Sequence, residues 1–160
     1  MAAIKKILVP IDFSPATEDI VKFVTDFAKP LGSEVELLHV AETSDIYANP
    51  PLLYSDREFF ETRVATLKEE IEALLQKYSD LMAKKGIKVH ATWVSGNPFI
   101  EIVKIAKEKG FDLIAMGSHG RSGLEHVFLG SVAEQVLHNS PCPVLTLKKR
   151  GFKFKPLWHG

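Results

Sequence analysis

The sequence contains one cysteine, Cys142, and no excess of charge of either sign. A single cysteine cannot form an intrachain disulfide, which excludes the disulfide framework of small secreted proteins. Because 20 Lys and Arg residues balance 20 Asp and Glu residues, the formal net charge is zero. A chain without net charge has no overall attraction to nucleic acid or to an anionic membrane, so we expect neither as a partner.

Long apolar runs are missing as well. No run approaches the roughly 18 to 20 residues that a membrane-spanning helix requires. Residues 1–6 lead directly into a strand-like segment, without an apolar secretory stretch and cleavage site. With 46% apolar and 25% charged residues among 160, the chain has the composition of one globular domain, and we expect it in the cytoplasm.

Short apolar segments alternate with segments of helical period along the chain. The apolar segments predict strands at residues 7–11, 35–40, 87–94, 113–116 and 143–147. The helical period, with its start and stop signals, predicts helices at residues 15–31, 60–85, 98–109 and 131–139. Residues 41–56 have no period and are expected to form a loop.

Two of the predicted helices begin with the same signal, a cap residue followed by proline, at Ser14-Pro15 and Asn97-Pro98. The second of them is expected to bury Ile100, Val103 and Ala106, which recur at helical spacing. The helix at residues 60–85 has an apolar stripe spaced like a coiled-coil seam. Because that stripe lasts only about three heptads, we prefer a helix packed on a sheet.

Strands that alternate with helices predict a parallel sheet covered on both faces. Right-handed crossovers leave few topologies for such a chain, and a doubly wound α/β sheet is the leading one. In these sheets ligands bind beyond the carboxyl ends of the strands, where the winding reverses direction. The loops after the first and fourth predicted strands are therefore the candidate ligand loops.

The loop after the fourth strand is rich in glycine. Gly117 follows the strand directly, Gly120 lies within the loop, and Gly130-Ser131 stands at the start of the next helix. Glycine permits positive φ and lets a ligand approach the main chain without a Cβ in the way. A helix start adds N–H groups and a partial positive charge, which suit a phosphate. The loop is therefore a candidate anion site, unless its glycines serve only the turn.

Several other kinds of site have no support. Gly130-Ser131-Val132 lacks the lysine of a Walker loop, and the dinucleotide fingerprint is missing after the first strand, where residues 12–15 read Asp-Phe-Ser-Pro. No Gly-x-Ser-x-Gly elbow and no metal-ligand spacing of His or Cys occurs. We therefore expect neither a catalytic residue nor a protein-bound metal. His39, alone in an apolar strand, is expected to be a buried, hydrogen-bonded core residue.

The glycine pattern, Gly117-x-x-Gly120 followed after nine residues by Gly130-Ser131, resembles the ATP-binding signature of the universal stress protein family. Further segments resemble the same family, at residues 9–14, 96–98, 112–121 and 140–144. The resemblance implies a Rossmann-like sheet of five parallel strands in the order 3-2-1-4-5, with ATP at the reversal between strands one and four. It also implies homodimers that pair through the fifth strand.

The resemblance further implies the residues that hold the nucleotide. Asp12 would accept the ribose hydroxyls, and elementary electrostatics agrees, because a carboxylate suits a diol and repels phosphate. The other residues would divide between adenine (Pro10, Val40, Met116) and phosphates (Gly117, Gly120, Gly130, Ser131, with His119 and Arg121 near them), while Val132 closes the site from the helix side.

The implied function is a dimeric binding or signalling module of the stress response, controlled by an adenine nucleotide. ATP is the expected ligand, and Mg²⁺ commonly accompanies a triphosphate. Nothing in the sequence places a general base beside an attacking water, so slow ATP hydrolysis stays open but a dedicated enzyme is not expected. The alternative is a nucleotide-free dimeric interaction protein of the same fold, with a purely structural glycine loop.

The chain is expected to divide into an α/β domain at residues 1–148 and a tail at residues 149–160. The tail interleaves basic and aromatic residues and has no acid. Contact with a partner or with the second subunit, disorder, and contact with nucleic acid or membrane all stay open for the tail.

Overall fold

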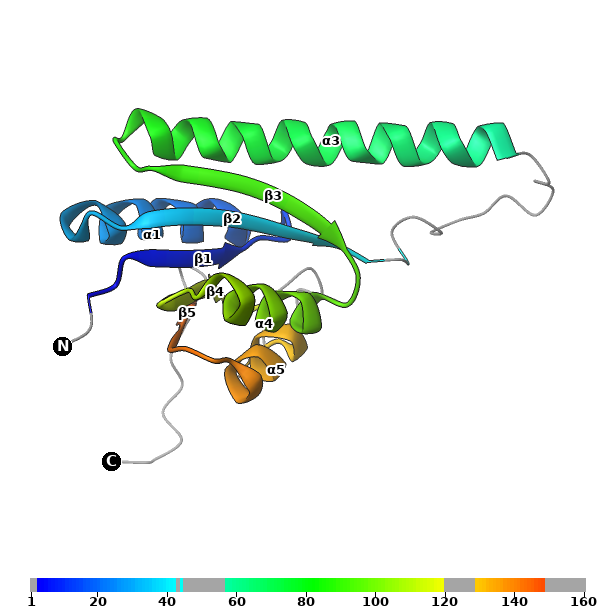
Figure 1. Cartoon of the computed structure of the whole chain (residues 1–160). Coiled ribbons are helices and arrows are strands. Elements are labelled where there is room, and N and C mark those ends of the chain that lie inside the picture. The colour runs from blue at the N-terminus through cyan, green and yellow to red at the C-terminus, as the bar shows by residue number, and fades with distance from the viewer. Residues whose placement is uncertain (1–2, 43, 45–56, 120–128, 149–160) are drawn as a thin grey trace, which may run out of the picture.

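A sheet of five parallel strands forms the centre of the structure (Figure 1). The computed structural model describes residues 3–42, 44, 57–119 and 129–148, and for residues 57–59 it describes the backbone only. The strand order is β3-β2-β1-β4-β5, which confirms the predicted doubly wound topology. The strands are β1 (Lys6–Pro10), β2 (Glu34–Ala41), β3 (Val89–Ser95), β4 (Leu113–Gly117) and β5 (Val144–Leu147).

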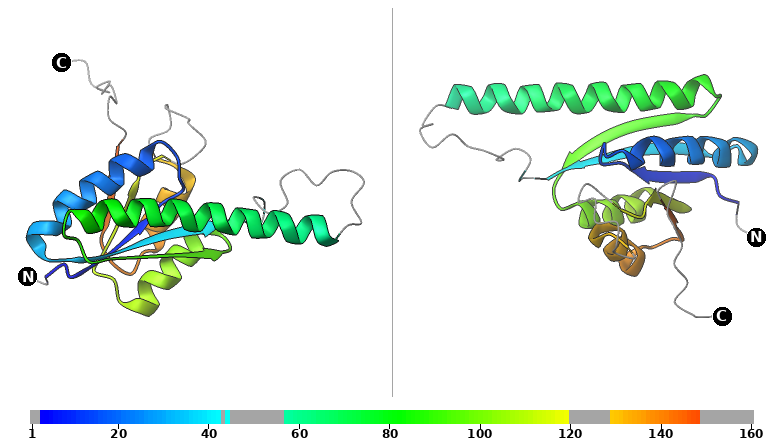
Figure 2. Two further views of the ribbon diagram at one scale, coloured as in Figure 1. Left: turned by 90° about the horizontal axis from the view of Figure 1, so that it is seen from above. Right: turned by 180° about the vertical axis from the view of Figure 1, so that it is seen from behind.

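Helices cover both faces of the sheet, and the two further views agree on their placement (Figure 2). One face carries α1 (Ala16–Leu31) and α3 (Arg57–Lys84), and the other carries α4 (Pro98–Lys109) and α5 (Ser131–Asn139). Among the described residues, no helix has the length and the apolar character needed to cross a bilayer.

The central strand β1 is buried on both faces. It pairs in parallel with β2 on one side and with β4 on the other. Ile7, Leu8 and Val9 have no exposed surface, because their side chains point alternately into two separate apolar cores. One core fills the space under α1 and α3, and the other fills the space under α4 and α5.

The helix α3 is much longer than the strands that it covers. Its 28 residues span about 42 Å at 1.5 Å per residue. Its N-terminal turns project beyond the carboxyl ends of the strands (Figure 1). Ile71, Leu75, Tyr78 and Met82 are buried against the sheet, so the expectation of a helix packed on a sheet is confirmed.

Two of the local signals have the predicted effect. Gly32 ends α1 in the left-handed conformation (φ 63°), and its N–H donates to the carbonyl oxygens of Ala28 and Lys29. Asn97 caps α4 by accepting a hydrogen bond from the N–H of Ile100, and Pro98 follows at the first helical position.

Two local predictions are wrong. Ser14 does not cap α1 with its side chain: the helix begins at Ala16 after Pro15, and the Ser14 hydroxyl has no hydrogen-bond partner. The residue before it, Phe13, has a left-handed conformation (φ 59°), which the serine-proline signal does not predict. In α4, Ala106 of the expected stripe is buried as predicted, but Ile100 is 49% exposed, and Ile102 and Ile105 are buried instead. The packing of α4 against α5 and the sheet selects the neighbouring stripe of the same helical period.

We predict that the two isoleucines of α4 differ sharply in their contribution to stability. Ile105→Ala should lower the free energy of unfolding by about 2 to 4 kcal/mol, because it removes buried methylene groups from the core. The matched change Ile100→Ala should cost less than about 1 kcal/mol, since most of that side chain already contacts water. Urea unfolding measures both, and equal losses would contradict the observed orientation of α4.

The carboxylate of Asp112 fastens the start of β4 to the start of β1. Its Oδ2 accepts hydrogen bonds from the backbone N–H groups of Lys5 and Lys6, each at 2.9 Å. These hydrogen bonds, more than the charges of the two lysines, lower the pKa of Asp112 below its ordinary value of 3.8.

We predict a pH-dependent cost for Asp112→Asn. A folded-state pKa below the unfolded value means that the stabilisation is fully present above the unfolded pKa and is lost as pH falls through the folded pKa. The variant should therefore be less stable than the parent at neutral pH, and the difference should shrink below about pH 4. Urea unfolding between pH 7 and pH 3 measures this, and a gap that widens in acid would contradict it.

Candidate functional site

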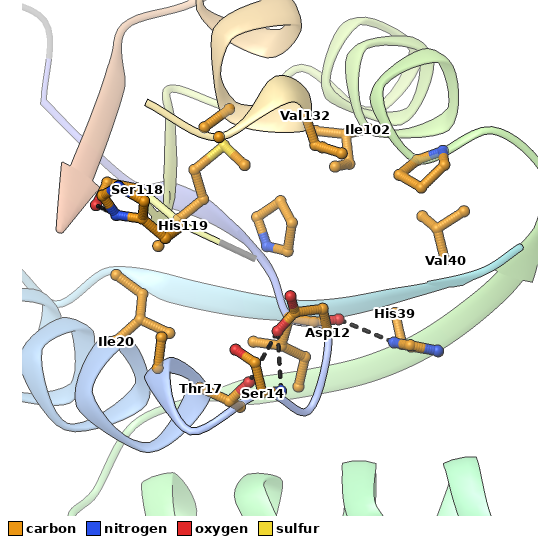
Figure 3. Close-up of a pocket in the computed structure, with 18 of the residues that line it drawn as sticks. Asp12, Ser14, Thr17, Ile20, His39, Val40, Ile102, Ser118, His119 and Val132 are labelled. Carbon is orange, nitrogen blue, oxygen red and sulfur yellow. Dashed lines mark hydrogen bonds between the residues drawn. The ribbon is translucent and has the colours of Figure 1, made fainter. Parts of the chain in front are cut away.

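A cavity of about 270 Å³ opens at the carboxyl edge of the sheet, where the winding reverses between β1 and β4 (Figure 3). Its walls come from the ends of β1, β2 and β4 and from the first turns of α1, α4 and α5. This is the place at which open α/β sheets bind their ligands.

The cavity brings together every predicted site residue that the structure describes. These lining residues are Pro10, Asp12, Val40, Met116, Gly117, His119, Gly130, Ser131 and Val132. Gly120 and Arg121 lie outside the described residues. The segments that meet here are far apart in the sequence, and the sheet topology brings them to one edge.

Asp12 stands at the end of β1 and is held by the turn that follows it. Its Oδ1 accepts a hydrogen bond from the N–H of Ser14 at 3.0 Å, and the hydroxyl of Thr17 lies 3.5 Å from the same oxygen. The labelled side chains of Asp12, Ser14 and Thr17 cluster on one side of the cavity (Figure 3). The carboxylate therefore has a fixed orientation at the cavity wall.

The hydroxyl of Ser14 is buried in this wall and has no hydrogen-bond partner. Among the described residues it is the only buried side-chain oxygen or nitrogen in that state. A buried hydroxyl without a partner is costly, and native structures satisfy almost all such groups with protein, water or ligand. The cavity therefore offers a hydrogen-bonding group that a polar ligand can satisfy.

The backbone conformation at the two glycines that flank the loop, Gly117 and Gly130, does not require glycine. Gly117 does not have positive φ, and a Cβ placed on it would come no closer than 3.5 Å to another atom of the chain. Gly130 has φ −68° and ψ 153°, an extended conformation open to any residue. Of the two properties of glycine considered above, positive φ is therefore not used at either position, and close approach of a ligand without a Cβ is the one that the cavity can use.

The start of α5 supplies N–H groups to the opposite wall. The N–H of Gly130 itself donates to the carbonyl oxygen of Ser118 at 2.7 Å. The following N–H groups, of Ser131 and Val132, have no acceptor within the helix, because the first turn of any helix lacks them. Those two groups and the Ser131 hydroxyl are the donors that α5 can present to an anion.

Two histidines border the cavity in different ways. His39 is only 2% exposed, and its Nδ1 lies 2.9 Å from the carbonyl oxygen of Ile11, so the expected buried and hydrogen-bonded core histidine is confirmed. His119 follows the end of β4, with its Nδ1 2.8 Å from the hydroxyl of Ser118. The bond to Ser118 fixes the His119 ring at the cavity wall.

The structure adds lining residues that sequence reasoning missed, among them Ser14, Thr17, Ile102 and Glu42. Thr17 is detectable in principle, because it follows Asp12 by five residues at a helix start. No local signal identifies Ile102, whose place depends on how α4 packs. Within the described part of the chain, no group of three or more His, Cys, Asp or Glu residues is arranged to hold a metal ion.

Comparison with known proteins gives a consistent result. The family model described as the universal stress protein family matches residues 3–148. The chain is 37% identical to the universal stress protein MJ0531 of Methanocaldococcus jannaschii over 145 residues, covering 91% of this chain and 82% of that protein. It is also 37% identical to MJ0577 of the same organism over 155 residues, covering 91% of this chain and 96% of that protein.

Solved structures agree with these relatives. The structure of MJ0577 superposes with a TM-score of 0.81 at 37% identity, covering 94% of this chain and 99% of that chain. Two more distant structures share the fold. One is a universal stress protein in complex with cAMP (TM-score 0.67, 20% identity, 92% and 98% covered), and the other is a family protein from Arabidopsis thaliana with AMP bound (TM-score 0.66, 19% identity, 92% and 93% covered).

We predict that the unpartnered hydroxyl can be removed without loss of stability. Ser14→Ala should leave the free energy of unfolding unchanged or raise it by up to about 1 kcal/mol, because it removes a buried group that lacks a hydrogen bond. Ser33→Ala is the matched control, since the Ser33 hydroxyl donates to the carbonyl oxygen of Ile4 at 2.6 Å. That control should cost about 1 kcal/mol in the same urea titration, and an equal cost for Ser14→Ala would contradict the assignment.

Proposed function

Because this chain belongs to the universal stress protein family, we propose that its carboxyl-edge cavity binds an adenine nucleotide, with ATP as the first expectation. The bound nucleotide controls a homodimeric binding or signalling module, and the protein is not a dedicated enzyme. Its cytoplasmic location stays a prediction from the sequence.

One observation carries the proposal: two walls of the same cavity differ in their chemistry and face each other. Asp12 and the unpartnered Ser14 hydroxyl lie on the α1 side, and the glycine-flanked start of α5 lies on the other. A carboxylate and a hydroxyl suit the diol of a ribose, whereas backbone N–H groups at a helix start suit phosphate. A nucleotide has both a ribose diol and phosphates, so a single ligand can contact both walls.

Adenine would occupy the apolar part of the cavity. Pro10, Val40 and Met116 line the cavity, and Ile102 adds a further apolar surface. The phosphates would contact Gly117, Gly130 and Ser131, with His119 beside them, and Val132 would close the site from the helix side. Gly120 and Arg121 remain predicted phosphate neighbours outside the described residues.

Two neighbours of the same fold support the choice of an adenine ligand, since one was solved with cAMP and the other with AMP. If ATP binds with Mg²⁺, the ion would be held mainly by the phosphates, because Asp12 and Glu42 are the only carboxylates among the cavity's described lining.

Dimerisation through β5 is part of the proposal. This strand is an edge of the sheet, and all four of its residues, Val144–Leu147, remain half-buried. An edge strand leaves N–H and C=O groups unpaired on one side, which favours pairing with a second strand. The edge of a second subunit would satisfy those groups and cover the apolar side chains.

We predict that two variants separate the ribose and phosphate contacts. Gly130→Val should abolish the binding of ATP but leave that of adenosine, because valine tolerates the extended backbone at this position but fills the space for phosphate. Asp12→Asn should weaken both ligands by about 1 to 3 kcal/mol, since both contain the ribose diol. Isothermal titration measures the affinities.

Thermal melting provides the control for binding itself. ATP at 100 times its dissociation constant should stabilise the parent protein by about 2.7 kcal/mol, which raises the melting temperature by roughly 5 to 11 °C, since each kcal/mol is worth about 2 to 4 °C in a chain of this size. If millimolar ATP, ADP and AMP all leave the melting temperature unchanged, the nucleotide-free interaction protein becomes the better account. If Gly130→Val keeps the full response to ATP, the phosphate assignment is wrong.

A further inference from the structure

A second cavity, of about 320 Å³, lies under α3. Its lining comes from the turn after β1 (Phe13), the end of β2 (His39, Ala41) and one face of α3 (Leu67, Glu70, Ile71, Leu74). His39 is shared with the carboxyl-edge cavity, and the other six residues are not. The family resemblance assigns nothing to this place.

The side chains of α3 and β2 around this space do not fill it. Leu67 and Leu74 belong to the sheet-facing stripe of α3, but they remain half-buried while Ile71 between them is 4% exposed. The last residue of β2 in this lining is Ala41, whose side chain is too short to fill the space. An apolar cavity of roughly 150 Å³ is already large enough to bind benzene, so this one has room for a larger body.

Two aromatic rings form a fixed wall. Phe13 stacks on His39 with ring centroids 4.4 Å apart and an interplanar angle of 27°. The His39 ring is anchored by its contact with the carbonyl oxygen of Ile11. Phe13 has φ 59°, which is rare for a bulky residue and costs about 1 to 3 kcal/mol unless its surroundings hold it in place.

Glu70 gives the cavity its charge. Among the described residues of the lining it is the only carboxylate, and it is exposed to solvent at the edge of a mainly apolar surface. Lys68, two residues away, pairs with Glu72 and not with Glu70, and no other ion pair of the described residues includes Glu70. A cation near this edge would meet an unpaired carboxylate and lie near the ring of Phe13.

We propose that the cavity under α3 is a second ligand site, which takes a small organic cation: a protonated amine on a compact aromatic or aliphatic body. The apolar body occupies the space between Leu67, Leu74 and Ala41, against the stacked rings. The ammonium group lies at the rim beside Glu70. This assignment does not depend on nucleotide binding.

The test uses 2-phenylethylamine and its neutral analogue 2-phenylethanol as probes, titrated calorimetrically into the full-length chain. The parent protein should bind both, and the amine should bind about two- to fivefold more tightly, the range expected for an exposed ion pair. Glu70→Gln should remove this preference. Glu69→Gln, an exposed neighbour outside the lining, is the matched control and should keep it.

Two variants that fill the cavity complete the test. Ala41→Leu and Leu67→Phe should each weaken both probes at least about tenfold, because the added atoms occupy the space of the apolar body. Leu67 is half-buried, so its variant decides the matter if Ala41→Leu fails to fold. Gly130→Val should bind both probes as the parent does. The proposal is overturned if the parent binds neither probe, or if Leu67→Phe binds them as tightly as the parent.

Discussion

Strand β1 is hydrogen-bonded to β2 along one edge and to β4 along the other, and the other features of the structure depend on this pairing. A strand paired on both edges and buried on both faces must carry apolar residues throughout, as Ile7, Leu8 and Val9 do. Charged side chains can follow only where the strand leaves the sheet. Asp12 is the first charged residue beyond that end, which places it where the sheet's winding reverses.

Features that depend on local sequence patterns, namely the order of strands and helices and some helix ends, could be predicted from the sequence. The alternation of strands and helices predicted the topology, and the helix ends at Gly32 and Asn97 follow from single-residue conformational preferences. The exposed Ile100 shows the limit of such patterns, because two neighbouring stripes of α4 fit the same helical period. Contact with α5 and the sheet decides between them, and no local signal contains that contact. Ser14 does not cap α1, and no local signal predicts the left-handed conformation of Phe13 that precedes it.

The candidate site was predictable to the extent that its residues stand at strand ends and helix starts. Those positions converge in any doubly wound sheet, so Asp12, Gly117 and Gly130 could be placed together before the structure was known. Side chains that reach the cavity from within helices were missed, as Ile102 shows. The cavity under α3 was also beyond sequence reasoning, because its lining comes from the turn after β1, the end of β2 and one face of α3, which only the packing of α3 brings together.

The turn at residues 12–14 contributes side chains to the walls of both cavities. Its first and third residues line the carboxyl-edge cavity, and Phe13 between them lines the cavity under α3. The N–H of Ser14 donates to the carboxylate of Asp12, and Phe13 between these two residues stacks on His39. His39 lines both cavities, and its Nδ1 lies against the carbonyl oxygen of Ile11, one residue before the turn. The same short turn and the same histidine therefore form part of the wall of both cavities, because the chain leaves the sheet between them.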